Sequence, residues 1–205
     1  ELTLNSTRFI KCELEKADFS NSSFDGLSVF SDSNMGGAVI ADANLDTAVF
    51  NSCTMQNVDF ARADLYKTTF FACEFENNIF TGAAIRLSLF HGADLKGTDF
   101  SNMDMTQCQF HNSRLDKCNF TNTKLKQGGF MYAALDGSKF DGSYLEYANF
   151  YEANLTASSF KKADMKMASL QGARLNGSYF TSANLYQAQM EGVEAESSFF
   201  EDANL

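Results

Sequence analysis

The chain of 205 residues contains no proline and no tryptophan, and it has only two histidines. It also lacks a run of about 18 apolar residues, the length that a membrane-spanning helix needs, so no membrane contact is expected. Bases are outnumbered by acids, 16 to 26, which leaves a net charge of −10. Nucleic-acid binding relies on a basic surface that neutralises phosphates. The charge balance therefore argues against a direct nucleic-acid partner.

What the chain has instead is a period of five residues. Every fifth residue over 30–205 is a large apolar residue, with Ala195 as the one exception among 36 positions. The same period runs one residue out of phase over 4–24, so a one-residue slip falls at 25–29. A helix turns through about 500° in five residues, and a strand sends odd-spaced side chains to alternate faces. Neither element keeps these residues on one side, so the chain must turn once per repeat, as in a solenoid.

The positions around each core residue support this interpretation. Two residues before it, the side chain is nearly always Ala, Ser or Cys, which suits a second, tighter inward position. Two residues after it, Gly and Asn recur, and both readily adopt the positive φ that the third residue of a type II turn needs. Stacked coils also use their N–H groups in ladders, which fits the missing proline. One uninterrupted domain over 1–205, with no linker, is predicted.

Short motifs then point to a family. The triplets Ala-Asp-Leu at 63–65 and 93–95 and Ala-Asn-Leu at 43–45 and 153–155 resemble the pentapeptide-repeat family, over essentially the whole chain. The resemblance implies an all-β fold, a right-handed quadrilateral parallel β-helix with four repeats per coil. An even number of sides also follows from the residues, because Phe and Leu/Met alternate along the period and so sort onto opposite pairs of walls. About ten coils are expected from this length.

The first candidate site is an outward column that follows the core phenylalanines and contains both histidines. We interpret it as an interaction strip made of Phe71, His91, His111, Met131 and Tyr151. Exposed aromatic strips often mark interfaces, whereas the simpler alternative is a ladder of similar side chains between coils. Two stacked imidazoles are a weak signal for a metal, so no metal or cofactor is predicted. Four apolar neighbours would widen the strip: Val49, Leu87, Leu89 and Tyr132.

The second candidate site is acidic. Residues 18–61 carry six acids and no base, and residues 175–205 carry five acids and no base, while the middle of the chain is nearly neutral. In a four-sided solenoid Asp18, Asp59 and Asp99 align in one column and two more acids lie on the next wall, so the candidate acidic surface is Asp18, Asp59, Asp64, Asp99 and Asp104. Such a surface either keeps an otherwise apolar protein soluble or imitates the phosphates of DNA.

The five cysteines occupy the small inward position, where a thiol acts as a small buried hydrophobe: Cys12, Cys53, Cys73, Cys108 and Cys118. An odd number of buried thiols suits the cytoplasm or another reducing compartment. We expect all five to be reduced and shielded.

No catalytic arrangement is visible, so an enzyme is not expected. Neither histidine lies in register with a Ser, Cys or Asp that would form a triad, and the glycines are spread at turn spacing instead of forming a phosphate loop. The preferred hypothesis is a non-catalytic binding scaffold that acts through its outer walls. The resemblance offers an alternative, a DNA mimic that binds DNA gyrase or topoisomerase IV. A second alternative is the repeat domain of a larger secreted bacterial effector.

The C-terminal coil gives the last expectation. The sequence stops in the middle of the repeat pattern, with apolar residues that form a candidate dimer end: Phe199, Phe200 and Leu205. Uncapped coils expose apolar core and strand edges. We expect either that the natural protein continues, or that a weak homodimer forms through this coil and tightens as salt screens its acids.

Overall fold

The computed structural model describes residues 2–4, 6–24 and 26–205. Its internal contacts divide the chain into two compact units, Glu1–Asp94 (unit 1) and Leu95–Leu205 (unit 2). In each unit the chain winds so that residues 20 positions apart pair in parallel. Core residues every five positions give four sides per coil, so the predicted all-β parallel solenoid is confirmed. The single continuous domain stays a prediction.

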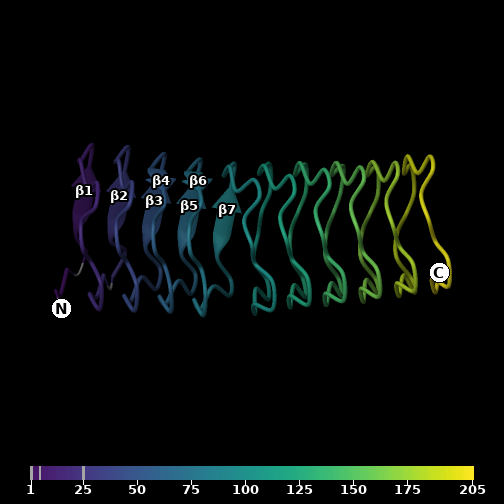
Figure 1. The fold of residues 1–205 in the computed structure, drawn as a ribbon, viewed down its shortest axis with the longest axis horizontal. Coiled ribbons are helices and arrows are strands. Elements are labelled where there is room, and N and C mark those ends of the chain that lie inside the picture. Colours follow the sequence, from purple (N-terminus) through teal and green to yellow (C-terminus); the bar gives the residue numbers. More distant parts are fainter. Residues whose placement is uncertain (1, 5, 25) are drawn as a thin grey trace. The chain divides into compact units, whose positions relative to one another are not determined.

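Strands long enough to assign lie in unit 1, and each has three residues. They are β1 (Arg8–Ile10), β2 (Val29–Ser31), β3 (Val49–Asn51), β4 (Thr54–Gln56), β5 (Thr69–Phe71), β6 (Glu74–Glu76) and β7 (Leu89–His91). One wall is a parallel sheet in the order β1-β2-β3-β5-β7, and a second wall pairs β4 with β6 (Figure 1). The described residues of unit 2 pair through isolated parallel bridges such as Asn119↔Lys139.

The register of unit 1 changes by one residue near the predicted slip. Val29 pairs with Val49, 20 residues on, whereas Phe9 pairs with Phe30, 21 residues on. A six-residue unit between them produces this offset; Asp25, its first residue, lies outside the described residues. At 20 residues a coil, unit 1 holds four complete coils and unit 2 five, each with part of another. The expected count of about ten therefore differs slightly, because each unit ends partway through a coil.

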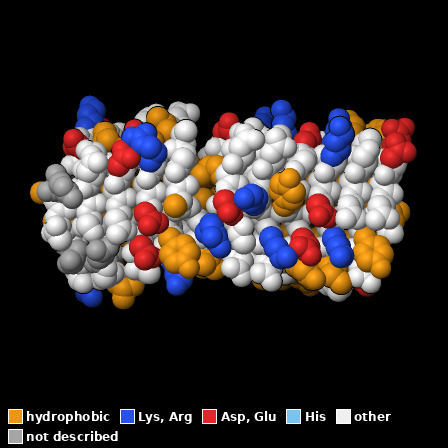
Figure 2. All heavy atoms as spheres, turned by 90° about the horizontal axis from the view of Figure 1, so that it is seen from below, with side chains coloured by type: hydrophobic (Ala, Val, Ile, Leu, Met, Phe, Trp, Pro, Cys, Tyr) orange, Lys and Arg blue, Asp and Glu red, His pale blue; other side chains and the backbone are white. Residues whose placement is uncertain are grey.

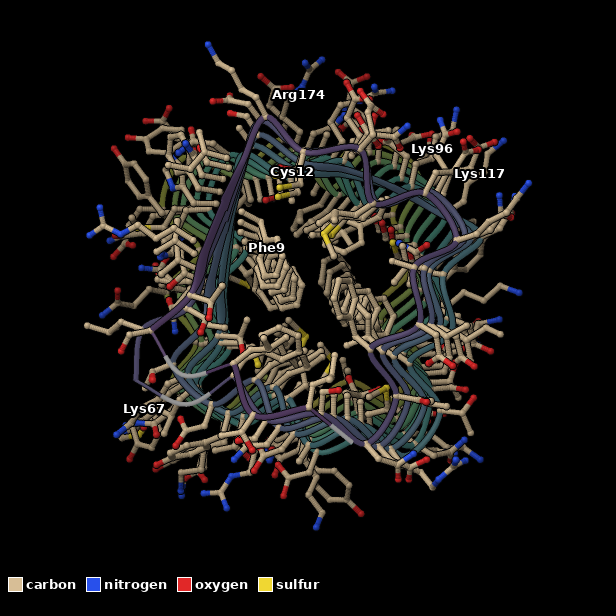
Figure 3. The ribbon with its side chains drawn as sticks, turned by 90° about the vertical axis from the view of Figure 1, so that its left-hand side faces the viewer. Phe9, Cys12, Lys67, Lys96, Lys117 and Arg174 are labelled. Atoms are coloured by element: carbon tan, nitrogen blue, oxygen red, sulfur yellow. The ribbon has the colours of Figure 1, made fainter. Side chains whose placement is uncertain are left out.

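Phenylalanine rings form the core and stack between coils. In unit 1 the centroids of Phe30 and Phe50 lie 4.6 Å apart with planes at 10°, and Phe9 points into the interior (Figure 3). In unit 2, Phe140 stacks on Phe160 at 4.8 Å and meets Phe150 edge-on. Offset stacks and edge contacts are the arrangements that aromatic pairs prefer. The predicted segregation of Phe onto opposite walls is thus visible as parallel stacks.

The small inward position has a second role that its size alone does not predict. Buried hydroxyls there donate to the carbonyl of a core residue in the preceding coil, as in Ser158 to Leu135 at 2.8 Å and Thr123 to Phe100 at 2.8 Å. These bonds satisfy polar groups that would otherwise be buried without a partner. The five cysteines are present as thiols, and Cys12 is the one that is only half-buried.

Many corners are tight turns of the predicted kind. In the turn after Ile40, the N–H of Ala43 donates to the Ile40 carbonyl at 3.2 Å, and Asp42 between them has φ of 59°. An i→i+3 bond with positive φ at the third residue defines a type II turn. The same left-handed conformation is forced on two leucines, Leu27 and Leu87, each with φ of 62°.

Candidate interaction surfaces

The outer wall formed by β2, β3, β5 and β7 carries no charged side chain. In each three-residue strand the central Phe points inward, so the two flanking residues must point outward. These eight outward residues are called the sheet face: Val29, Ser31, Val49, Asn51, Thr69, Phe71, Leu89 and His91. Parallel register stacks them into two columns, one mainly aliphatic and one ending in Phe71 and His91.

Phe71 is the most exposed member of the sheet face. Its side chain is 47% exposed, and its ring stacks on the His91 imidazole with centroids 5.4 Å apart and planes at 2°. The other members are half-buried. The structure therefore joins two predicted strip residues, together with Val49 and Leu89, into one uncharged patch.

The two edges of the sheet face differ. At one edge lie Leu27, which is 65% exposed, and Leu87, both in the left-handed conformation. A bulky residue with positive φ is an outlier that local sterics disfavour. On the other side, Asp32 directly follows β2 at the edge, and Glu74 opens β6 on the adjacent wall, three residues after Phe71; both carboxylates are exposed.

The other three predicted strip residues lie in unit 2. The N–H of Met131 donates to Nδ1 of His111 at 3.2 Å, and the Tyr151 ring meets Tyr132 edge-on at 5.7 Å. A hydrogen bond to the Glu152 carboxylate raises the pKa of Tyr151. All three strip residues are half-buried, while Tyr132 is 50% exposed. Continuity of the five-residue strip across the two units stays a prediction.

The candidate acidic residues share a structural role that the sequence interpretation missed. Each uses one carboxylate oxygen to accept the N–H two residues on: Asp18 from Ser20 (2.9 Å), Asp59 from Ala61 (2.8 Å), Asp64 from Tyr66 (3.1 Å), Asp99 from Ser101 (2.9 Å) and Asp104 from Thr106 (3.2 Å). Such Asx turns favour Asp and Asn at this position. The bonds to Ser20 lower the pKa of Asp18. These acids thus fix their own turns, whatever else they bind.

A third surface, on unit 2, was not predicted from the sequence. Exposed apolar and aromatic side chains gather on one wall with lysines between them, and we call this the Tyr–Lys wall: Tyr144, Tyr147, Met167, Tyr186, Lys124, Lys126 and Lys166. Figure 2 shows basic and acidic side chains alternating over the C-terminal part of one face. Lys126 Nζ lies 2.7 Å from Glu146 and 5.7 Å from the Tyr147 ring centroid.

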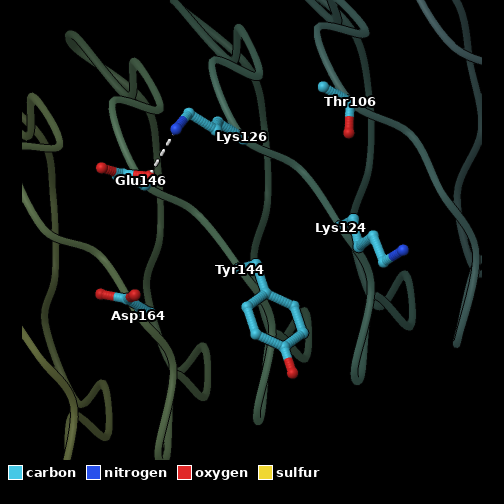
Figure 4. A pocket seen from close by; sticks show the side chains of 6 residues that line it. All are labelled: Thr106, Lys124, Lys126, Tyr144, Glu146 and Asp164. Carbon is cyan, nitrogen blue, oxygen red and sulfur yellow. Dashed lines mark hydrogen bonds and ion pairs between the residues drawn. The ribbon is translucent and has the colours of Figure 1, made fainter.

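The Tyr–Lys wall contains a hollow of about 260 Å³. It is lined by Thr106, Lys124, Lys126, Tyr144, Glu146 and Asp164, with Tyr144 between Lys124 and Asp164 (Figure 4). A signal was present in the sequence, since Tyr and Lys recur beside the core residues of this wall. It was masked because those residues fall in three columns rather than one.

The predicted dimer end is apolar. Phe199 and Leu205 are 48% and 73% exposed, and the half-buried Phe200 stacks on Phe180 at 4.8 Å. One of the five acids in this region is paired, because Glu194 lies 3.3 Å from Arg174 Nε. A dimer through this coil stays a prediction.

Features of two other kinds of site are absent from the described part of the chain. No group of three His, Cys, Asp or Glu residues there has the arrangement to hold a metal ion. No helix in those residues combines the length and hydropathy of a membrane span.

Family models match most of the chain. A model described as a pentapeptide repeat region matches residues 2–80, and one described as pentapeptide repeats (8 copies) matches residues 88–127, 133–166 and 158–194. A comparison with curated proteins gives no match.

Solved structures of similar proteins include three that differ widely in source. HetL of the cyanobacterium Nostoc sp. strain PCC 7120, involved in heterocyst differentiation regulation, is 19% identical over 100% of this chain and 87% of its own, with a TM-score of 0.39. A pentapeptide repeat protein of the Arabidopsis thaliana thylakoid lumen is 32% identical. The match covers 47% of this chain and 67% of the Arabidopsis chain, with a TM-score of 0.46. QnrB1, a plasmid-mediated fluoroquinolone resistance protein, is 15% identical. The match covers 96% of this chain and 92% of the QnrB1 chain, with a TM-score of 0.37.

Proposed function

The chain belongs to the pentapeptide-repeat family, and from this we propose that it is a non-catalytic protein-binding scaffold that acts through its outer walls. The observation that carries the proposal is the sheet face of unit 1. It is an uncharged patch with a half-exposed aromatic ring, in a chain whose net charge is −10. Aromatic side chains surrounded by apolar neighbours supply much of the binding energy in protein interfaces.

Photocrosslinking tests the proposal at the centre of the sheet face. A photoreactive phenylalanine analogue is placed at Phe71 and, as a matched control, at Ile79, which is 49% exposed in the same unit. Irradiation in an extract of the source cells should give a discrete protein adduct from position 71 and none from position 79. Equal or absent adducts at both positions would contradict the proposal.

A second candidate function is binding to DNA gyrase or topoisomerase IV, as the family resemblance implies for some members. It is favoured by residues 18–61, which hold acids and no base. A supercoiling assay with purified gyrase tests this function. If it holds, replacing Asp18, Asp59 and Asp64 by Asn should abolish any inhibition or protection, because Asn keeps the turn bonds and removes only the charge.

For the same protein we propose a reducing compartment, such as the cytoplasm. Its support is the set of five thiols, four of which are buried.

A further inference from the structure

We propose that the sheet face binds one amphipathic α-helix of a partner protein, with basic residues of that helix lying on the side of Asp32 and Glu74. This inference rests on the proposed protein-binding function and names the kind of segment that binds.

The strands of the sheet face are joined to one another by backbone hydrogen bonds. The N–H of Val49 donates to the Ser28 carbonyl at 2.9 Å, and the N–H of Leu89 donates to the Thr68 carbonyl at 2.9 Å. Strand addition needs an edge with unpaired backbone groups, and the middle of a sheet offers none. The sheet face therefore presents side chains alone, and its partner must bury side chains against it. An amphipathic helix does this with apolar residues at i, i+3, i+4 and i+7.

The size of the sheet face also fits one helix. Neighbouring strands lie about 4.8 Å apart and a three-residue strand is about 10 Å long, so four strands give a patch of roughly 15–20 Å by 10 Å. A helix is about 10 Å wide and rises about 1.5 Å per residue, so roughly 10–13 residues cover the patch. A stable interface between two globular proteins buries about 800 Å² on each partner, several times this area. A single helix is therefore a better match than a second copy of the chain.

The edges give the bound helix an orientation. Asp32 and Glu74 are exposed carboxylates on one side, where they attract lysine or arginine side chains. The opposite edge carries Lys67 and Arg86 beside the exposed Leu27, with Asp46 as one acid in the Arg86 column, so its net positive charge repels the same cations and Leu27 accepts apolar residues. A helix with an apolar stripe and basic residues on one flank satisfies both edges at once.

Selection from a display library of 16-residue peptides tests the inference. The bait is the full 205-residue chain, and counterselection uses its Phe71→Glu variant. Enriched peptides should show the helical apolar spacing with Lys or Arg on one flank, and should gain helical circular dichroism on binding. Phe71→Glu should weaken their binding at least about tenfold, while the matched Ile79→Glu variant should bind within about twofold of the parent. The double variant Asp32→Asn, Glu74→Gln should lose about threefold or more, together with the salt dependence of binding.

Other outcomes overturn the inference. Enriched peptides with strand-type alternation or acidic flanks, or peptides that bind Phe71→Glu as well as the parent, exclude a basic helix at this site. If such peptides dominate while a protein still crosslinks to position 71, the helix inference fails and the protein-binding function stands. If no peptide depends on Phe71 and no protein crosslinks there, both fail.

Discussion

The two units build the same core and differ at one outward column. In the largest sheet of unit 1 the residue before the core Phe is Arg8 in β1 and Val29, Val49, Thr69 and Leu89 in the four strands of the sheet face. The same repeat position in unit 2 holds a glutamine, a glycine and an asparagine, Gln109, Gly129 and Asn149. Both units fold, so the solenoid does not require aliphatic residues in this column. Their presence in unit 1 therefore points to binding rather than to folding.

The units also differ in how they use charge. The sheet face of unit 1 is free of charged side chains, whereas lysines, acids and tyrosines alternate on the Tyr–Lys wall of unit 2, with Lys126 paired to Glu146. Paired surface charges keep a wall soluble and contribute little stability. An uncharged wall lacks the solubility that surface charges provide, and such a wall is retained more readily where a partner covers it.

The largest expected effect concerns the shared core. Phe110 in unit 2 is fully buried and packs on Phe130, Phe100 and Phe120, so Phe110→Ala should cost about 3–5 kcal/mol because stacked rings cannot close the cavity. Phe9 in unit 1 is half-buried and stacks on a ring on one side, so Phe9→Ala should cost about 1–2 kcal/mol. Reversible urea unfolding measures both, and a cost below about 1 kcal/mol for Phe110→Ala would mean that the core register is wrong.

The second expected effect probes the column in which the units differ. A Cβ at Gly129 would collide with the Gln109 amide and the His111 ring. Gln109 would then lose its bonds to the carbonyls of Gln107 (2.9 Å) and Gln127 (3.2 Å), so Gly129→Ala should destabilise the chain by about 1–2 kcal/mol. In a Gln109→Ala background the cost should shrink. Identical costs in both backgrounds would show that the Gln109 contact contributes nothing.

The fold was predictable from the sequence because a five-residue period leaves the backbone almost no choice. Core position follows from residue type from Phe30 to Phe200, whereas turn position follows from the period itself, since residues such as Leu87 adopt the same positive φ as Gly and Asn. The hydrogen bonds donated by buried hydroxyls such as that of Ser158 were not predicted, because the small size of serine already explains its presence at the inward position.

The candidate surfaces were less predictable, because outward positions are free of the packing constraint that makes the core periodic. Phe71 and His91 were placed together correctly, since one column contains both. The acids were predicted as a surface, yet Asp59 and its counterparts also close their own turns, a role visible only once the N–H two residues on is located. The Tyr–Lys wall combines three columns around one core row, and no single spacing reveals it.

The third prediction concerns thiol reactivity in the native state. Cys12 in unit 1 is half-buried, whereas Cys118 in unit 2 is buried and donates to the Leu95 carbonyl at 3.1 Å. The hydrogen bond between Cys53 and Cys73 raises the pKa of Cys73, together with burial, and lowers the pKa of Cys53, so the protection of Cys53 rests on its burial. Because the thiolate is the reactive form, Cys12 should react with a bulky disulfide reagent at least about tenfold faster than the other four cysteines. Peptide mapping after timed labelling checks this, and rapid modification of Cys53 or Cys73 would place their column outside the core.

The smallest expected effect compares one exposed ion pair from each unit. In unit 1 the Arg62 guanidinium donates to Asp42, with Nε 2.7 Å from Oδ1, and lowers the pKa of Asp42 below 3.8. Stability from a lowered carboxyl pKa is present above the unfolded value and is lost as pH falls through the folded one, so whatever this pair contributes is present at neutral pH and disappears only at the acid end. In unit 2 the Glu146 carboxylate raises the pKa of Lys126 above 10.5, so that contribution is lost only as pH rises through the alkaline range. Arg62→Ala should therefore return the Asp42 pKa towards 3.8 in a carboxyl-carbon NMR titration and leave stability at neutral pH almost unchanged, because both side chains are exposed. If Arg62→Ala instead lost as much stability at neutral pH as Gly129→Ala, ion pairs as well as apolar packing would contribute to the stability within each unit.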